Sequence, residues 1–322
     1  MYTPHHLFFD TVIAGTLIVS GLLFWFILRD AFLKKNGWFF KYRAISLATL
    51  FLLAGAFLTV FYGSFIEPQI IVVNRQNINL FNDGKPPLKI ALISDLHAGP
   101  YKKEWFFKRV AEKIKRENPD LIFLNGDLVE TDIVELKYAA PVFELAQSIP
   151  TIAVLGNHDT GDGLTNEDFF AVPEKIAFIK QGLAEKKITL LQNQNITADN
   201  GSRKFILGGT KEYLSGDEDV ALAFSGAPKN LPRILLAHNP DTIYEALKEK
   251  IGLILSGHTH GGQIRLPLVG AVGEPFTDLG KSFDKGWFNF GGTRLFISSG
   301  LGEAGTRARL FNPPEIVILS VY

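Results

Sequence analysis

Five short polar segments follow apolar, strand-like runs and carry the side chains best suited to catalysis. In the 322-residue chain, five of the seven histidines lie in these segments, which contain no cysteine. A lone Asp-x-His or Gly-Asp has an ordinary explanation as a turn, but five such segments together predict a shared site. The segments are Asp95-Leu96-His97, Gly126-Asp127, Gly156-Asn157-His158-Asp159, His238-Asn239-Pro240 and Gly257-His258-Thr259-His260-Gly261-Gly262.

The side chains of these segments are carboxylates, an amide and imidazoles. Such ligands suit borderline or hard divalent ions such as Mn, Fe, Zn or Co. Residues two apart in the Asp-x-His and His-x-His pairs can point to the same side of a strand end. A glycine directly precedes Asp127, Asn157 and His258, where it permits a sharp turn and removes bulk near an ion.

The ordered set resembles the calcineurin-like metallophosphoesterase family, whose pattern is D-x-H, GD, GNH[DE], a lone His and GH-x-H. The match runs over roughly Lys89 to Gln263. The resemblance implies a four-layer α/β/β/α sandwich with two metal ions, Asp127 bridging them. It assigns one metal to Asp95, His97, Asp127 and His260, and the other to Asp127, Asn157, His238 and His258.

The charges of this ligand set agree with phosphate hydrolysis. Two divalent ions bring four positive charges and two carboxylates cancel two, which leaves a centre that binds phosphate and activates water. We expect manganese first, with Fe, Zn or Co as alternatives. The resemblance implies that His158 contacts the phosphoryl oxygen or protonates the leaving group while Asp159 fixes its tautomer. The alternative for His158 is a hydrogen-bonded structural histidine.

The elements that must position these residues alternate between short apolar runs and amphipathic stretches. Strands are expected at 88–94, 121–125 and 151–156, with helices at 103–116 and 134–147 between them. This α/β pattern delivers reactive groups at the carboxyl ends of strands. Antiparallel additions are expected within 270–292, and further strands at 187–193, 204–209, 233–238, 253–257, 294–299 and 315–321.

The first 66 residues have a different composition from the rest. Thr11–Leu28 and Ala44–Phe65 contain no charged residue, and each is long enough to cross a bilayer. A cleaved signal peptide is the alternative for the first run, but it lacks a positive amino-terminal region. We therefore expect a membrane anchor over residues 1–66 with two transmembrane helices, and a catalytic domain over residues 67–322.

The loop between the two runs predicts the orientation of the chain. It holds five basic residues against Asp30, whereas the first ten residues contain no Lys or Arg. The positive-inside rule places this loop in the cytoplasm, and therefore the catalytic domain on the exoplasmic face of a bacterial cytoplasmic membrane. The basic residues are Arg29, Lys34, Lys35, Lys41 and Arg43.

Composition excludes several classes of protein. Lys+Arg and Asp+Glu both number 33, so a nucleic-acid-coating protein is not expected. The absence of cysteine excludes a disulfide scaffold, a thiolate zinc site and a Cys nucleophile.

The segments GHTHGGQIRLP and RLFISSGLGEAGTRARLFNPPEIVIL resemble a bacterial membrane-associated branch of the family, which includes UDP-2,3-diacylglucosamine hydrolase. That resemblance implies a phosphoester or pyrophosphate substrate in a lipid or cell-envelope precursor. The alternatives are a membrane-tethered phosphodiesterase or nucleotidase for soluble substrates, and a non-catalytic membrane scaffold. The scaffold is disfavoured because no ligand of the set is replaced.

Two further features near the site could contact lipid or phosphate. In the helix at 103–116 the buried stripe turns Trp105 outward near Lys102, Arg109 and Lys113, a basic face for anionic headgroups or else an ordinary solvated face. The pair Arg307 and Arg309 is a candidate contact for pyrophosphate, with a solvated charge pair as the alternative.

Overall fold

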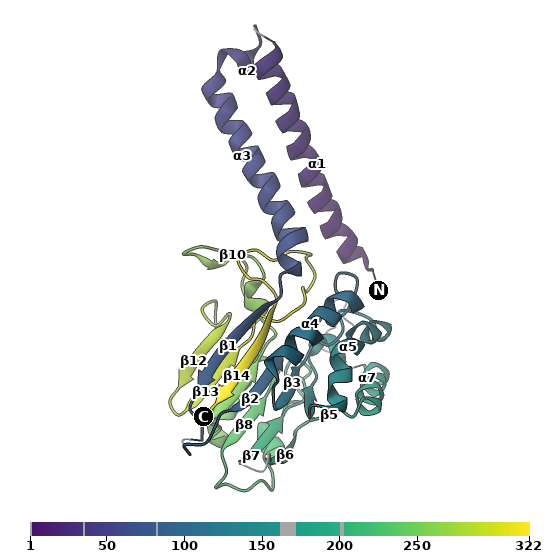
Figure 1. The fold of residues 1–322 in the computed structure, drawn as a ribbon, viewed down its shortest axis with the longest axis vertical. Helices are drawn as coiled ribbons and strands as arrows, with labels where there is room; N and C mark the ends of the chain where they lie inside the picture. Colours follow the sequence, from purple (N-terminus) through teal and green to yellow (C-terminus); the bar gives the residue numbers. More distant parts are fainter. Residues whose placement is uncertain (1, 35, 82, 162–171, 200–202) are drawn as a thin grey trace.

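The computed structural model describes residues 2–34, 36–81, 83–161, 172–199 and 203–322. A helical hairpin stands on an α/β domain (Figure 1). Its helices are α1 (Pro4–Leu33) and α3 (Arg43–Phe61), joined through the short α2 (Trp38–Lys41). The second helix continues through a π-helical turn, η1 (Tyr62–Ile66), and a 3-10 turn, η2 (Glu67–Gln69).

Both arms of the hairpin are long and apolar enough to cross a membrane. Each contains an 18-residue window of mean hydropathy 2.3, of which only 11% is buried. That exposure differs from the core helix of a soluble protein. At about 1.5 Å per residue, α1 is longer than a hydrocarbon core of about 30 Å. Its first turns instead meet the α/β domain, where Tyr101 Oη donates to Asp10 at 3.2 Å.

The α/β domain contains two six-stranded sheets. The first has the order β1-β14-β2-β3-β4-β5, in which β2 to β5 are parallel and β14 runs antiparallel to β2. Its strands are β1 (Val72–Ile78), β2 (Leu88–Ile93), β3 (Leu121–Asn125), β4 (Thr151–Val154), β5 (Thr189–Leu190) and β14 (Glu315–Val321).

The second sheet has the order β12-β13-β9-β8-β7-β6, with parallel pairing from β13 to β7 and antiparallel strands at both edges. Its strands are β6 (Gln194–Asp199), β7 (Lys204–Gly209), β8 (Arg233–Leu236), β9 (Leu253–Ser256), β12 (Gly286–Phe290) and β13 (Thr293–Ile297).

The apolar core fills three spaces between four layers. Leu92 and Phe123 of the first sheet pack with Leu207, Leu236 and Leu255 of the second. The helices α4 (Glu104–Glu117), α5 (Ala140–Phe143) and α7 (Pro173–Glu185) cover the first sheet. The short helices α8 (Val220–Ala223) and α9 (Ile243–Ala246) cover the second. The predicted α/β/β/α sandwich is thus confirmed.

Local structure differs from expectation in several places, among them α7, where no helix was predicted. The helix expected at 134–147 is divided into η3 (Ile133–Ala139), α5 and η4 (Glu144–Gln147), with Pro141, which lacks an amide proton, at the start of α5. The strand expected at 187–193 shrinks to β5. The polar strands β1 and β6 were not predicted, because each gains its place by pairing with β14 or β7 rather than from an apolar run.

The predicted basic face of α4 is wrong in one respect. Lys102 precedes the helix and is fully buried, where it pairs with Glu303 at 3.1 Å and donates to the carbonyl of Pro68. Trp105 is half exposed as expected, and the Arg109 guanidinium lies 5.8 Å from its ring centroid.

Candidate metal centre

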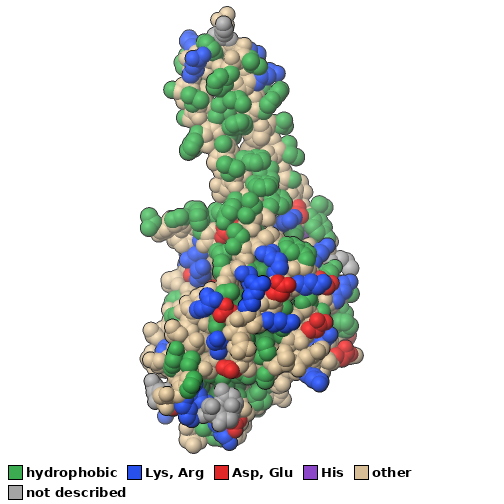
Figure 2. All heavy atoms as spheres, viewed as in Figure 1, with side chains coloured by type: hydrophobic (Ala, Val, Ile, Leu, Met, Phe, Trp, Pro, Cys, Tyr) green, Lys and Arg blue, Asp and Glu red, His purple; other side chains and the backbone are tan. Residues whose placement is uncertain are grey.

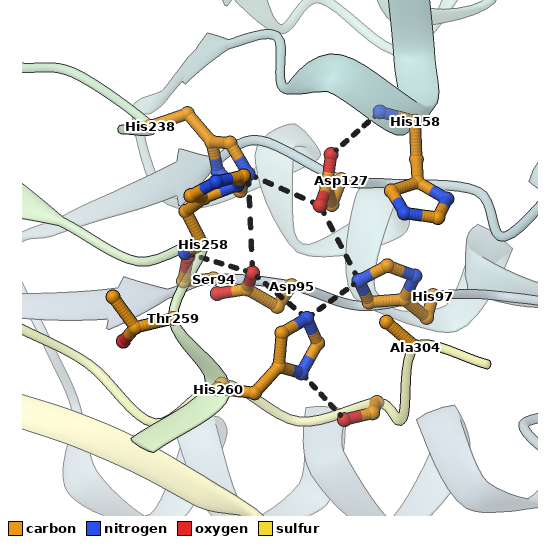
Figure 3. A network of polar contacts seen from close by, with 12 residues as sticks. Ser94, Asp95, His97, Asp127, His158, His238, His258, Thr259, His260 and Ala304 are labelled. Carbon is orange, nitrogen blue, oxygen red and sulfur yellow. Dashed lines mark hydrogen bonds and ion pairs between the residues drawn. The ribbon is translucent and has the colours of Figure 1, made fainter. Parts of the chain in front are cut away.

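The predicted ligands lie at the carboxyl ends of strands from both sheets. Asp95 and His97 follow β2, Asp127 follows β3 and Asn157 follows β4 in the first sheet. His238 follows β8, and the His258–His260 turn follows β9 in the second sheet. Figure 3 shows the aspartates and histidines of both sheets converging on one point.

Four of these residues form a first group. The ligand atoms of Asp95, His97, Asp127 and His260 all lie within 4.8 Å of one another. His97 Nε2 is 3.3 Å from Asp127 Oδ2 and 3.0 Å from His260 Nε2. His260 Nε2 is in turn 3.4 Å from Asp95 Oδ1.

A second group shares Asp127 with the first. The ligand atoms of Asp127, His238 and His258 also lie within 4.8 Å of one another, and His238 Nε2 is 3.0 Å from Asp127 Oδ2. Asn157 lines the same cavity. All seven predicted ligands are therefore brought together, with Asp127 between the two groups.

Unpaired polar atoms indicate that this cluster fits cations. Asp95 Oδ2, Asn157 Oδ1 and His258 Nε2 are buried and have no hydrogen-bond partner within the described part of the chain. Each buried polar atom without a partner destabilises the folded state by about 1–3 kcal/mol if nothing compensates it. Divalent ions would coordinate these oxygen atoms and the imidazole nitrogen together.

Backbone conformation adds a feature that the spacing did not predict. Five of the predicted ligands have φ between 41° and 68°, a left-handed region rarely occupied by non-glycine residues and enriched at functional sites. The Asp-x-His and His-x-His pairs are therefore presented by left-handed turns and not by extended strand ends, which corrects the geometric explanation. The residues are Asp95, His97, Asp127, His258 and His260.

Glycines make room for these turns, as predicted. A Cβ atom on Gly156 would overlap Asp127 Oδ1, and one on Gly257 would overlap Asp95 Oδ2. Glycine is therefore needed at both positions by space rather than by its own dihedral angles.

Burial and neighbouring charges shift the pKa values of two of these residues, Asp127 and His258. Burial opposes ionisation of Asp127, but the His238 and His158 rings outweigh it and hold the pKa of this carboxyl well below its usual range. Burial, aided by the charge of His238, lowers the pKa of His258 to about 3. His258 is therefore a neutral imidazole, the form that binds metal.

Glu130, which the sequence analysis did not single out, contacts His97 on the side of its ring that faces away from the cluster. Its Oε2 is 2.5 Å from His97 Nδ1, so the other ring nitrogen, Nε2, faces the cluster. Its Oε1 is 3.4 Å from His6 Nε2 at the start of α1 and accepts from the Gly305 amide at 3.2 Å. An acid three residues after Asp127 was the available signal, whereas no pattern connects it to His6.

A second side-chain relay joins the end of the other long helix to the cluster. Glu67 in η2 accepts from the amides of Phe311 and Asn312 at 2.9 and 2.5 Å. Asn312 Nδ2 donates to the carbonyl of His260 at 2.7 Å. Each arm of the hairpin thus ends one side chain away from a residue of the cluster.

His158 lies on the cavity wall, but its predicted partner is wrong. Its Nδ1 is 2.7 Å from the carbonyl of Glu130, and that carbonyl rather than Asp159 fixes its tautomer. Asp159 is fully buried and accepts instead from the amides of Leu128, Val129 and Gly156 at 2.8–3.2 Å. Asp159 therefore joins the loops after β3 and β4.

Arg309 differs from both alternatives for the arginine pair. Arg309 is fully buried, lies 3.3 Å from Glu303 and donates to backbone carbonyls of Ser299 and Asn312. Arg309 therefore links the loop residues that precede β14, and it is neither solvated nor available to pyrophosphate. Arg307 lies over the rings of Phe65 and Tyr101.

The cluster opens into a cavity of about 640 Å³. Its lining includes Asp127, Asn157 and His158 from the cluster, together with residues of the loop Gly273–Asp278. A space of this size accommodates a phosphate with a sizeable substituent.

Comparison with known proteins agrees with this geometry. The family model for calcineurin-like phosphoesterases matches residues 88–262. Phosphodiesterase YaeI of Escherichia coli is 34% identical over 267 residues, which cover 81% of this chain and 92% of that protein. UDP-2,3-diacylglucosamine pyrophosphatase LpxG of Chlamydia trachomatis is 28% identical over 320 residues, covering 85% and 95% of the two chains.

Among solved structures, the phosphopantetheinyl hydrolase of Mycobacterium tuberculosis is similar with a TM-score of 0.42 and 13% identity, over 66% of this chain and 89% of that one. The matched family segment contains all seven predicted ligand residues, and it spans more than half of the chain. This chain is a metal-dependent phosphohydrolase and belongs to the calcineurin-like phosphoesterase family.

Proposed function

We propose that this protein hydrolyses a phosphoester or diphosphate bond in a membrane lipid or lipid-linked cell-envelope precursor. One observation carries the proposal: both membrane-type helices end beside the ligand cluster, each separated from it by one side chain. His6 of α1 reaches it through Glu130, and Glu67 after α3 reaches it through Asn312. A bilayer around the hairpin would therefore lie beside the catalytic cavity.

In this proposal Asp95, His97, Asp127 and His260 hold one divalent ion, and Asp127, Asn157, His238 and His258 hold the other, with manganese expected. The bound ions supply positive charge for the phosphate and activate water. His158 has Nδ1 committed to the Glu130 carbonyl, so Nε2 is the ring nitrogen left for substrate. When protonated there, it can donate to a phosphoryl oxygen or to the leaving group.

The far end of the hairpin supports the exoplasmic orientation of the catalytic domain. Lys34 pairs with Asp30 at 2.7 Å, while the Arg29 and Arg43 guanidinium groups lie over nearby aromatic rings. Figure 2 shows the Lys and Arg side chains gathered at this end, with a long apolar surface between them and the domain. Such a basic end is favoured on the cytoplasmic side.

The experiment is a turnover assay of the full-length protein in mixed micelles with Mn²⁺. The substrates are lipid phosphates and diphosphates, UDP-2,3-diacylglucosamine and water-soluble phosphodiesters, with Asp127→Asn as the inactive control. We expect kcat/KM to rise with acyl chains on the substrate and to depend on its surface concentration. Equal kcat/KM for acylated and soluble substrates would overturn the lipid assignment.

A second candidate is a membrane-tethered phosphodiesterase for soluble substrates. The 34% identical relative, named a phosphodiesterase, favours it. The same assay separates the two, because this candidate requires efficient soluble-diester turnover that is indifferent to micelles.

A further inference from the structure

An exposed apolar segment, Arg265–Phe276, projects beside the cavity, and we call it the apolar lip. It contains a two-stranded hairpin, β10 (Arg265–Leu266) and β11 (Gly270–Ala271). All four residues from 266 to 269 are exposed, and Leu268 is fully so. A run of this kind on a soluble surface is unfavourable unless something covers it. The exposed large apolar residues of the lip are Leu266, Leu268, Val269, Val272 and Phe276.

The turn at the tip of the lip holds its leucine in an unfavourable conformation. The Val269 amide donates to the Leu266 carbonyl at 3.2 Å, and Pro267 and Leu268 are the central residues. Leu268 has φ 68°, at a position that favours glycine in a turn with proline before it. An apolar side chain that is fully exposed there, against backbone preference, indicates a role outside the fold.

The lip begins at the membrane end of the domain. The Arg309 amide donates to the carbonyl of Gly63 in η1 at 2.8 Å, and the next residue, Leu310, accepts from the Arg265 amide at 2.8 Å. Figure 1 shows β10 reaching sideways at the level where α3 meets the domain, and Figure 2 shows this projection as an apolar finger.

The lip is also continuous with the catalytic cavity. Gly262, two residues after His260, packs so closely on Ala271 that a Cβ atom would overlap it. Phe276 lines the cavity and is 81% exposed. One face of the segment therefore borders the cavity while its tip stands free.

We propose that the apolar lip inserts its tip, Leu266–Val269, into the bilayer that surrounds α1 and α3, and that it guides a lipid headgroup into the cavity. The occupant of this surface is lipid, because the segment starts beside the end of α3 and points along the same membrane level. Insertion of the tip stands by itself, whereas headgroup guidance rests on the proposed function.

The absence of cysteine makes insertion directly measurable. A Leu268→Cys variant has a single thiol, which can be labelled with an environment-sensitive fluorophore in nanodiscs containing brominated phospholipids. Ile18→Cys, 61% exposed in the middle of α1, is the positive control. Leu222→Cys, 53% exposed on α8 beside β6, is the negative control. We expect quenching at 268 to approach that at 18, and quenching no greater than at 222 would overturn the proposal.

Guidance is tested with Leu268→Gly, which suits the turn and removes the side chain. We expect KM for a lipid substrate in nanodiscs to rise about tenfold, as fits the loss of one buried leucine, with kcat/KM for soluble bis(p-nitrophenyl) phosphate unchanged. An unchanged lipid KM would overturn guidance. If no lipid is hydrolysed by the unmodified protein, the proposed function fails, and the quenching result still decides insertion.

Discussion

Replacing Glu130 with glutamine tests whether the contact behind His97 controls metal binding. The variant keeps the size of the side chain and one acceptor for the Gly305 amide but removes the charge that faces His97 Nδ1 at 2.5 Å. Both partners are buried, with side-chain exposures of 0% and 5%, so solvent screens their interaction little. Loss of such a supporting group lowers metal affinity about 10- to 100-fold, which corresponds to about 1.4–2.8 kcal/mol.

The assay is hydrolysis of a soluble phosphodiester as a function of Mn²⁺ concentration, with bound metal counted in parallel. We expect the half-saturating Mn²⁺ concentration of Glu130→Gln to rise at least about tenfold, while kcat at saturating metal stays within a few-fold. Glu117→Gln, which breaks only the Arg75 pair on the surface, is the matched control and should change neither value. An unchanged half-saturating concentration for Glu130→Gln would refute the reasoning.

Three further predictions concern single sites. His6→Ala removes the α1 contact to Glu130 and should weaken Mn²⁺ binding less than Glu130→Gln does, with the exposed His5→Ala as control; equal Mn²⁺ titrations for the two variants would contradict it. His158→Ala should lower kcat by about 10²–10⁴-fold without loss of bound metal, and loss of metal instead would make it structural. Gly156→Ala should reduce bound metal because its Cβ atom overlaps Asp127 Oδ1, and metal retained at the native level would count against this geometry.

The site residues could be predicted from the sequence where they directly follow apolar runs. The runs before Asp95, Asp127 and His238 are buried strands, and parallel strands bring their carboxyl ends to one edge. The family resemblance assigned the Asp and His residues to two groups that also lie together in the structure, while Asn157 lines the same cavity. The left-handed conformation of five ligands was not predictable, because dihedral angles of this kind leave no signal in residue types other than glycine.

Contacts between segments that are far apart in the chain could not be predicted from the sequence either. His6 and Glu130 are 124 positions apart and belong to an apolar helix and a loop, so neither periodicity nor spacing relates them. The sequence suggested that Lys102 and Arg309 are surface charges, but both side chains are buried and each forms an ion pair with Glu303. Asp159 was assigned to the histidine next to it in the chain, although its oxygens satisfy backbone amides of two loops.

The two-metal site is tested most directly by metal content and activity measured together on the full-length protein in detergent. We predict two divalent ions per chain in the protein loaded with Mn²⁺, and hydrolysis of a phosphodiester that Asp127→Asn abolishes, because Asp127 belongs to both ligand groups. Full activity with Asp127→Asn, or a single bound ion at saturation, would contradict the account.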